Sequence, residues 1–333
     1  MKKLKNNTDM YTFHELNDLV ASTFVNLKFS KEPISLYSPV EYILGIGGKR
    51  IRPILTLAGC NVFSDSIEKA QSPSVAVEIF HNFTLVHDDI MDNADIRRGQ
   101  PTIHKRWDNN SAILSGDAMT ILAYQFLTNV DYKYLSRVLH IFNSFALGIC
   151  EGQQYDMDFE KRSDVTRNEY LKMIELKTAV LLKGALQIGA VIGDAKDSDI
   201  ERIGEFGRCL GVAFQLQDDL LDTYGNVETF GKKIGGDIVA NKKTILTIET
   251  MNLLKSSDKE EFINLMSDYK LEKTAKIDAV IKIYDRVKVK ELVNVLIKNY
   301  FDSAMTSLNS ISVSSERKVV LYEIAEKLMN RNS

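Results

Sequence analysis

Helical periodicity along most of the chain is the feature that most constrains its fold. Apolar residues recur at three- and four-residue intervals in long segments, which is the pattern of amphipathic helices. The 333 residues include only 5 Pro and 18 Gly, and alternating strand patterns are scarce, so a turn-rich β fold is disfavoured. We therefore predict an all-α fold. The expected helices cover about 15–28, 53–63, 72–92, 111–128, 133–160, 167–194, 197–224, 241–254, 258–268, 285–309 and 315–330.

The composition suits one domain rather than two. Hydrophobic residues make up 44% of the chain and charged residues 26%, which is enough apolar material for a large core. No Ser/Pro-rich linker or long charge run divides the sequence. We predict a single large helical bundle over residues 1–333, with functional loops at 93–110 and 224–241 and a surface connection at 255–275.

Charge and cysteine usage exclude several classes of protein. The net charge is −3, from 42 basic and 45 acidic residues, whereas general nucleic-acid binding needs a concentrated basic face. The cysteines, Cys60, Cys150 and Cys209, are isolated and odd in number, which fits buried thiols in a reducing compartment. The N-terminal segment lacks the apolar core of a secretory signal, and no apolar run approaches the ~20 residues of a membrane span. We expect a cytoplasmic protein without a membrane span.

Two expected helices carry the motif Asp-Asp-x-x-Asp, once as Asp88-Asp89-Ile-Met-Asp92 and again as Asp218-Asp219-Leu-Leu-Asp222. At 3.6 residues per turn, the first and last aspartates of each motif lie on one face. Like charges at this spacing repel, so an acidic stripe on an apolar helix needs a compensating cation. Mg²⁺ prefers oxygen ligands and is commonly shared between carboxylates and substrate phosphates. One such motif alone would suggest a solvated acidic face, but two copies favour a metal and diphosphate site.

Basic segments accompany both motifs and complete an anion site. Gly47–Pro53 (GGKRIRP) places cations after a flexible turn and at a helix N-terminus, which favours anions. Arg97–Pro101 (RRGQP) follows the first motif, and Arg side chains bind phosphate through paired hydrogen bonds. Gly231–Lys243 follows the second motif and contains GKKIGGD and NKK. Each segment alone could be a solvated patch, but their pairing with the aspartates favours diphosphate binding.

Together these motifs resemble the trans-isoprenyl diphosphate synthases, the polyprenyl synthetase family. The resemblance runs from about Gly45 to Lys243 and rests on GGKRIRP, HDDIMD, RRGQPT, a Lys-Thr pair, FQLQDDLLD and GKKIGGD in the family's order. It implies a helical bundle of the isoprenoid synthase type with a central cavity, and a homodimer. The implied reaction is the Mg²⁺-dependent, head-to-tail condensation of isopentenyl diphosphate with an allylic diphosphate.

The resemblance also implies roles for individual residues. Asp88 and Asp92 would hold two Mg²⁺ ions, and Asp218 a third, with Asp222 and Asp237 acting through water. The residues implied to contact the allylic diphosphate are Arg97, Lys177, Lys232 and Lys242. Those implied to bind isopentenyl diphosphate are Lys49, Arg52, His81 and Arg98. The oxygens implied to face the allylic cation are those of Thr178, Gln215 and the Lys177 carbonyl. Residues with supporting roles or facing the cavity would be Asp89, Gln153, Asp156 and Asp219.

Product length in this family is implied to depend on residues before the first motif. Thr84 and Phe80 lie four and eight positions before Asp88, about one and two turns along the same face. Phe83, five positions before Asp88, is where the family blocks the tunnel. An aromatic Phe83 beside a small Thr84 resembles geranylgeranyl-type synthases more than farnesyl-type ones. All three could equally be ordinary core residues.

Several alternatives remain at this point. A farnesyl or longer-chain synthase would use the same machinery. A class I terpene cyclase usually carries a different second motif and lacks GGKRIRP, and head-to-head synthases have a wider aspartate spacing. A non-catalytic partner subunit would be expected to show degenerate aspartate motifs, whereas both are intact here. A purely structural bundle would leave both acidic stripes unexplained.

Overall fold

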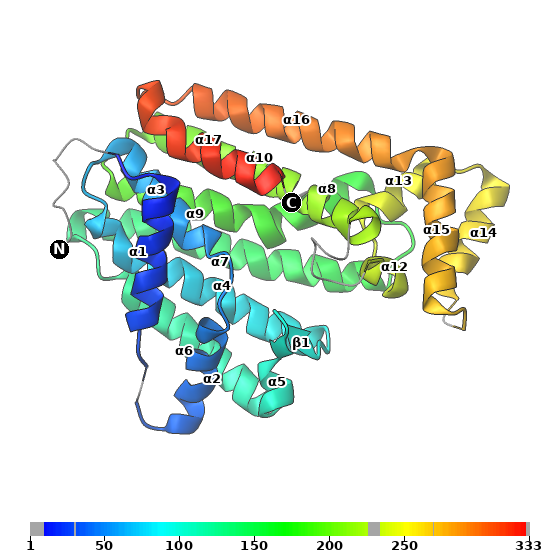
Figure 1. The fold of residues 1–333 in the computed structure, drawn as a ribbon, viewed down its shortest axis with the longest axis horizontal. Helices are drawn as coiled ribbons and strands as arrows, with labels where there is room; N and C mark the ends of the chain where they lie inside the picture. The colour runs from blue at the N-terminus through cyan, green and yellow to red at the C-terminus, as the bar shows by residue number, and fades with distance from the viewer. Residues whose placement is uncertain (1–9, 30, 226–233, 269, 331–333) are drawn as a thin grey trace. The chain divides into compact units, whose positions relative to one another are not determined.

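The computed structural model describes residues 10–29, 31–225, 234–268 and 270–330, and almost all of its regular structure is helical (Figure 1). Within these ranges the only strands are β1 (Ile96–Arg97) and β2 (Gln100–Pro101), which pair antiparallel. The prediction of an all-α fold is confirmed. The helices before residue 130 are α1 (Phe13–Asn26), α2 (Ile34–Gly45), α3 (Ile51–Phe63), η1 (Glu68–Ala70), α4 (Gln71–Met91), α5 (Ile103–Arg106) and α6 (Asn109–Leu127). The later ones are α7 (Tyr132–Glu160), α8 (Arg167–Ile174), the π-helical η2 (Glu175–Ala179), α9 (Val180–Ile192), α10 (Asp197–Tyr224), α12 (Gly236–Val239), α13 (Ile245–Leu253), α14 (Ser256–Ser267), α15 (Lys273–Val287), α16 (Val289–Asn309) and α17 (Ser315–Met329).

The chain forms two compact units. Unit 1 comprises Met1–Asn143, Gly184–Ile203 and Ser312–Leu321, and unit 2 comprises Ser144–Lys183, Gly204–Ile311 and Tyr322–Ser333.

Unit 1 is built around α4, which packs against α3 and α6. The contact with α6 is close because Gly116 faces His87: a Cβ at this glycine would lie 2.3 Å from Nε2 of the imidazole. The same imidazole nitrogen lies 3.2 Å from the carbonyl oxygen of Ile113. Helix α6 begins where the Asp108 carboxylate accepts the Ser111 N–H at 2.8 Å, an N-cap that satisfies one of the first backbone donors. These contacts hold α4, which carries the first aspartate motif, firmly in unit 1.

Unit 2 is built around a large apolar core that contains residues of α8, η2, α10, α13, α14, α15 and α16. Helix α8 begins with a capping box in which Thr166 and Glu169 satisfy each other's backbone N–H groups. The π-helical η2 lies close to two other helices through glycines. A Cβ at Gly152 of α7 would lie 2.4 Å from the Lys177 amide nitrogen, and one at Gly211 of α10 would lie 2.6 Å from Cα of Ala179. Both glycines are therefore required for this segment to pack where it does.

Most predicted helices are present, but several boundaries were wrong. Helix α2 was not predicted; it contains Pro39 in its second turn, where the missing N–H removes one intrahelical hydrogen bond. The predicted helix 167–194 is interrupted by the π-helical η2. The predicted helix 285–309 spans a break between two helices. Lys288 adopts a left-handed conformation (φ 55°), so α15 ends before it and α16 begins after it. In Figure 1 these two helices run in clearly different directions.

The predicted loops also contain short elements. The loop at 93–110 includes the β1–β2 hairpin and α5, and the loop at 224–241 includes α12. The segment 255–275 contains α14, which corresponds to the predicted helix 258–268, and the start of α15, which was not predicted. Periodicity could not resolve the hairpin, α5 and α12 because they are short.

Candidate active site

The first aspartate motif lies at the C-terminal end of α4. The Asp92 N–H donates to the Asp88 carbonyl at 2.8 Å, and the following Asn93 has φ 54°, so the helix ends within the motif. Asp88 is half-buried and Asp92 is exposed. A helix C-terminus carries partial negative charge, which makes it an unfavourable place for carboxylates without a cation.

The middle carboxylate of this motif has a different role. Asp89 is only 1% exposed, and Arg97 donates to its Oδ1 from Nε at 3.0 Å and also from Nη2. Burial raises the pKa of Asp89, while the Arg97 guanidinium opposes that rise. The arginine predicted to contact diphosphate is thus held in place by the middle aspartate of the motif.

The β1–β2 hairpin brings its second arginine onto the GGKRIRP turn. Arg98 (φ 52°) and Gly99 (φ 76°) form its two-residue turn, and both have the left-handed conformation typical of tight hairpins. Nη1 of Arg98 donates to the Gly47 carbonyl. A Cβ at Gly48 would lie 2.7 Å from Cζ of Arg98, so only glycine leaves room for the guanidinium. Lys49, exposed, is the next residue in the same turn.

His81 is the buried centre of a group that we call the basic cluster: Arg52, His81, Arg97 and Arg98. The imidazole is 9% exposed. Burial lowers its pKa well below the usual value, and the positive charges of Arg52, Arg98 and Arg97 lower it further. His81 is therefore neutral, with one ring N–H to donate. Unit 1 thus brings together three of the four residues predicted for isopentenyl diphosphate, and Lys49 flanks them.

Glu78 is a component of this region that the sequence analysis missed. Its side chain is 3% exposed, and Oε1 accepts from Nδ2 of Asn82 at 3.1 Å. Burial raises the pKa of Glu78, and Arg52, Arg98 and Arg50 oppose that rise. A signal was present, since an acidic residue three positions before His81 interrupts an apolar stretch of the predicted helix.

In unit 2 the second motif belongs to a group that we call the carboxylate cluster: Asp218, Asp219, Asp222 and Asp237. Oδ2 of Asp222 accepts from the Asp237 backbone N–H at 2.9 Å. Burial, followed by the negative charge of Asp237, raises the pKa of Asp219 to about 8, and Asp218 adds to the rise. So much negative charge in one place favours a bound cation.

The Lys-Thr pair lies in η2 and contacts neighbouring helices of unit 2. Nζ of Lys177 donates to Oδ2 of Asp156 at 2.6 Å. Oγ1 of Thr178 donates to Oε1 of Gln215 at 3.1 Å. The three residues predicted to face the allylic cation are thereby close together. Lys232 lies outside the described residues, and the Lys242 N–H donates to the Asp237 carbonyl at 2.9 Å, next to the carboxylate cluster.

The residues predicted to set product length belong to an aromatic group in unit 1. The ring centroids of Phe80 and Phe83 are 5.3 Å apart, and those of Phe80 and Phe142 are 5.1 Å apart. The ring centroids of Phe142 and Tyr124 are 5.0 Å apart. The contacts of Phe142 with Phe80 and with Tyr124 were not predicted from the sequence. Oγ1 of Thr84 donates to the His81 carbonyl at 2.8 Å, one turn back in the same helix.

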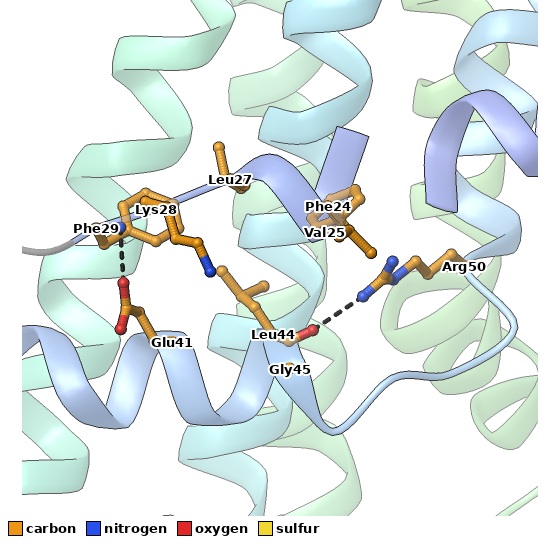
Figure 2. Close-up of a pocket in the computed structure, with 9 residues that line it drawn as sticks. All are labelled: Phe24, Val25, Leu27, Lys28, Phe29, Glu41, Leu44, Gly45 and Arg50. Atoms are coloured by element: carbon orange, nitrogen blue, oxygen red, sulfur yellow. Dashed lines mark hydrogen bonds between the residues drawn. The ribbon is translucent and has the colours of Figure 1, made fainter. Parts of the chain in front are cut away.

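A separate cavity of about 240 Å³ lies where α1 meets α2 (Figure 2). Arg50 lines it and is held there, since Nη2 donates to the Leu44 carbonyl at 3.0 Å and the guanidinium lies 4.4 Å from the Phe24 ring centroid. Glu41, on the opposite wall, accepts the Phe29 N–H at 2.9 Å. These contacts are structural, and no predicted site residue lines the cavity.

The donor set fits magnesium shared with a diphosphate rather than a metal enclosed by protein. Among the residues that the structure describes, no three His, Cys, Asp or Glu side chains converge as a ligand set. Mg²⁺ is usually held by one or two carboxylates, with water and substrate phosphates as its other ligands. Burial and then the negative charge of Asp237 raise the pKa of Asp219, and such an ion would offset the repulsion between these carboxylates.

A family model described as polyprenyl synthetase matches residues 33–284. This chain belongs to the polyprenyl synthetase family. The predictions of the family and of a prenyltransferase are therefore confirmed. No helix in the described part of the chain is long and apolar enough to cross a bilayer.

Proteins named as prenyl diphosphate synthases are similar to this chain over most of its length. The geranylgeranyl diphosphate synthase of Methanosarcina mazei is 35% identical over 301 residues, covering 90% of both chains. The geranylfarnesyl diphosphate synthase of Natronomonas pharaonis is 39% identical over 236 residues, which cover 66% of this chain and 69% of that one. A crystal structure of a geranylgeranyl pyrophosphate synthase is 40% identical, covers 97% of this chain and all of its own, and has a TM-score of 0.92.

Proposed function

We propose that this polyprenyl synthetase condenses isopentenyl diphosphate head-to-tail with dimethylallyl, geranyl or farnesyl diphosphate, giving geranylgeranyl diphosphate as its main product. The observation that carries the proposal is the presence of two complementary groups in one chain. The basic cluster surrounds the neutral His81 in unit 1, and the carboxylate cluster surrounds the buried Asp219 in unit 2. The first is suited to a diphosphate, and the second to divalent cations that accompany one.

Binding of the two substrates follows from these groups. We assign isopentenyl diphosphate to Lys49, Arg52, His81 and Arg98, because cationic and N–H donors are the natural partners of phosphate oxygens. We assign the allylic diphosphate to the two aspartate motifs through three Mg²⁺ ions. Asp88 and Asp92 would hold two of them and Asp218 the third, with Asp222 and Asp237 acting through water.

The remaining cations would complete the allylic site. Arg97, oriented by Asp89, and Lys177, oriented by Asp156, would bind the same diphosphate. Lys232 and Lys242 follow the second motif and have the same proposed role.

The chemistry is ionisation, condensation and elimination. When bound, Mg²⁺ supplies electrostatic stabilisation of the departing diphosphate. The allylic carbon–oxygen bond breaks with its electron pair leaving on diphosphate. The oxygens of Thr178, Gln215 and the Lys177 carbonyl would face the allylic cation. The isopentenyl double bond then attacks this carbon, and a proton passes to the released diphosphate, since no side chain is an obvious base.

Product length is proposed from the aromatic group. Phe83, packed against Phe80, would limit the growing tail, and the small Thr84 would leave room before that limit. Similarity to a geranylgeranyl synthase and to a geranylfarnesyl synthase supports a chain of this range. A farnesyl or longer product is the alternative, and it would follow if Phe83 does not lie in the path of the tail.

A homodimer is proposed from an apolar face on α6. Ile113, Leu114 and Ile121 are 45%, 60% and 61% exposed, although they are large and apolar. Their spacing places them on one side of the helix, as expected for an interface. Sedimentation or light scattering would test this: the wild type should have twice the monomer mass, and Ile121→Glu should weaken association.

A cytoplasmic location and a single functional domain over 1–333 are also proposed. Cys60 and Cys209 are buried, as expected for thiols in a reducing compartment, whereas Cys150 is exposed. The family match from residue 33 to 284 includes parts of both units, which supports one functional domain.

The decisive experiment incubates purified protein with Mg²⁺, isopentenyl diphosphate and each allylic diphosphate in turn, followed by chromatography of the products. Geranylgeranyl diphosphate should dominate, and chelation of Mg²⁺ should stop the reaction. Farnesyl or longer products would correct only the chain length. No condensation with any primer would contradict the enzyme and favour a non-catalytic partner subunit.

A further inference from the structure

A chain of hydrogen bonds in unit 2 links a buried tyrosine to the residues proposed to face the allylic cation. Tyr170 of α8 is 3% exposed and lies in the apolar core of the unit. Its hydroxyl donates to Oδ2 of Asp219. The other carboxylate oxygen, Oδ1, accepts from Nε2 of Gln215 at 3.2 Å. Oε1 of Gln215 accepts from Oγ1 of Thr178 at 3.1 Å.

The direction of each bond in this chain follows from the groups involved. Both oxygens of Asp219 accept in this arrangement, Oδ2 from the Tyr170 hydroxyl and Oδ1 from the NH₂ end of the Gln215 amide. The carbonyl end of the amide therefore points toward Thr178. The threonine has a single hydroxyl proton, and donating it to Gln215 leaves the lone pairs of Oγ1 available for other partners.

The opposite amide orientation would be unfavourable for the proposed reaction. The two ends of an amide have nearly the same shape, so packing alone does not prevent a flip. A flipped Gln215 would present N–H groups, with their partial positive charge, where positive charge develops on the allylic carbon. The bond from Tyr170 holds the Asp219 carboxylate in the rotamer that prevents this flip.

We propose that Tyr170 is a positioning residue that orients Gln215 and Thr178 through Asp219, and thereby supports ionisation of the allylic diphosphate. This inference rests on the proposed function. Tyr170 touches neither substrate nor metal in this scheme, and its ring also belongs to the core. Only the hydroxyl group carries the positioning role.

The test is Tyr170→Phe, which removes the hydroxyl and keeps the ring. We expect kcat to fall about 10- to 100-fold, as for other losses of alignment around a reacting centre, with KM for both diphosphates within about threefold of wild type, since the binding groups are unchanged. The matched control is Tyr134→Phe. Tyr134 is 5% exposed and also donates to an aspartate, Asp194, at 2.7 Å, but in unit 1 and without a link to Gln215. It should keep the wild-type kcat.

A double-mutant cycle separates positioning from general destabilisation. If Tyr170 acts through Gln215, Tyr170→Phe should have little further effect on kcat in a Gln215→Ala background. Full additivity of the two effects, or a wild-type kcat in the single variant, would overturn the positioning role alone. An equal loss in Tyr134→Phe would overturn it as well, because loss of any buried hydroxyl would then suffice. Absence of product from the wild type would instead overturn the proposed function, and the positioning role with it.

Discussion

Arg97 donates to Oδ1 of Asp89 through both Nε and Nη2, so the middle aspartate of the first motif binds an arginine of the following hairpin. Asp89 is buried, whereas Asp88 is half-buried and Asp92 is exposed. We therefore propose a division of roles in the motif: the middle carboxylate orients Arg97 toward the allylic diphosphate, and the outer two hold metal ions.

Asp89→Ala should release Arg97 from this position. We expect KM for the allylic diphosphate to rise about tenfold, because a positioned charge pair is lost. The free energy of unfolding should fall by about 1–3 kcal/mol. The loss should not be larger, because the Arg97 side chain is 27% exposed and water can solvate it once Asp89 is removed. Steady-state kinetics and urea unfolding measure the two effects. Asp95→Ala is the control: Asp95 pairs with Lys105 at 3.1 Å in the same loop but is 79% exposed, so both quantities should stay near wild type.

Asp88→Ala and Asp218→Ala should each lower turnover by about 100-fold or more, since each removes a proposed metal ligand. The folded structure should persist, so circular dichroism should match the wild type while product formation falls. Asp302→Asn, which alters an exposed carboxylate paired with Lys298 on α16, should leave turnover unchanged. Retained turnover in Asp88→Ala would contradict the metal assignment.

Phe83→Ala should lengthen the products, because it removes the ring that packs 5.3 Å from Phe80 and 4.8 Å from His87. Thr84→Phe should shorten them by adding an aromatic ring one turn before Asp88. Both variants can be compared by chromatography of the dephosphorylated products. An unchanged product distribution in both would reject this part of α4 as the limit of the tail.

His81 should make stability depend on pH. Its pKa in the folded protein is lowered well below the usual value, mainly by burial. Below about pH 6.5 the unfolded chain binds a proton that the folded protein does not, so stability is lost as the pH falls. The slope from this one group is about 1.4 kcal/mol per pH unit between the two pKa values.

Urea unfolding of wild type and His81→Gln at pH 7.5 and pH 5.5 would measure this contribution. The wild type should lose more unfolding free energy than the variant over this range. Equal losses would mean that folding does not lower the pKa of His81, which would contradict the assignment of a buried neutral imidazole.

The fold class and most of the helices could be predicted because they depend on long apolar periodicity. Helix α2 was not predicted; it contains Pro39, a residue that is unfavourable in a helix interior. The break at Lys288 depends on a left-handed residue other than glycine, for which the sequence offers no cue.

The two aspartate motifs could be predicted from their spacing and the other candidate site residues from the family resemblance, but not the contacts among them. The pairing of Asp89 with Arg97, and of Tyr170 with Asp219, joins segments that no periodicity relates. Glu78 was missed for a similar reason: its importance comes from three arginines that are distant in the sequence. Local sequence patterns identify side chains that can bind metal or diphosphate. Tertiary packing determines which of these side chains become neighbours.

The π turn at Glu175–Ala179 has a consequence for altering this protein. Such a turn contains one residue more than an α-helical turn, so it behaves as a single inserted residue within a longer helix. Deleting one residue there would restore ordinary α geometry and remove the bulge, which would displace Lys177 and Thr178 within it. Engineers who shorten or graft this stretch should therefore conserve its length as strictly as its Lys-Thr chemistry.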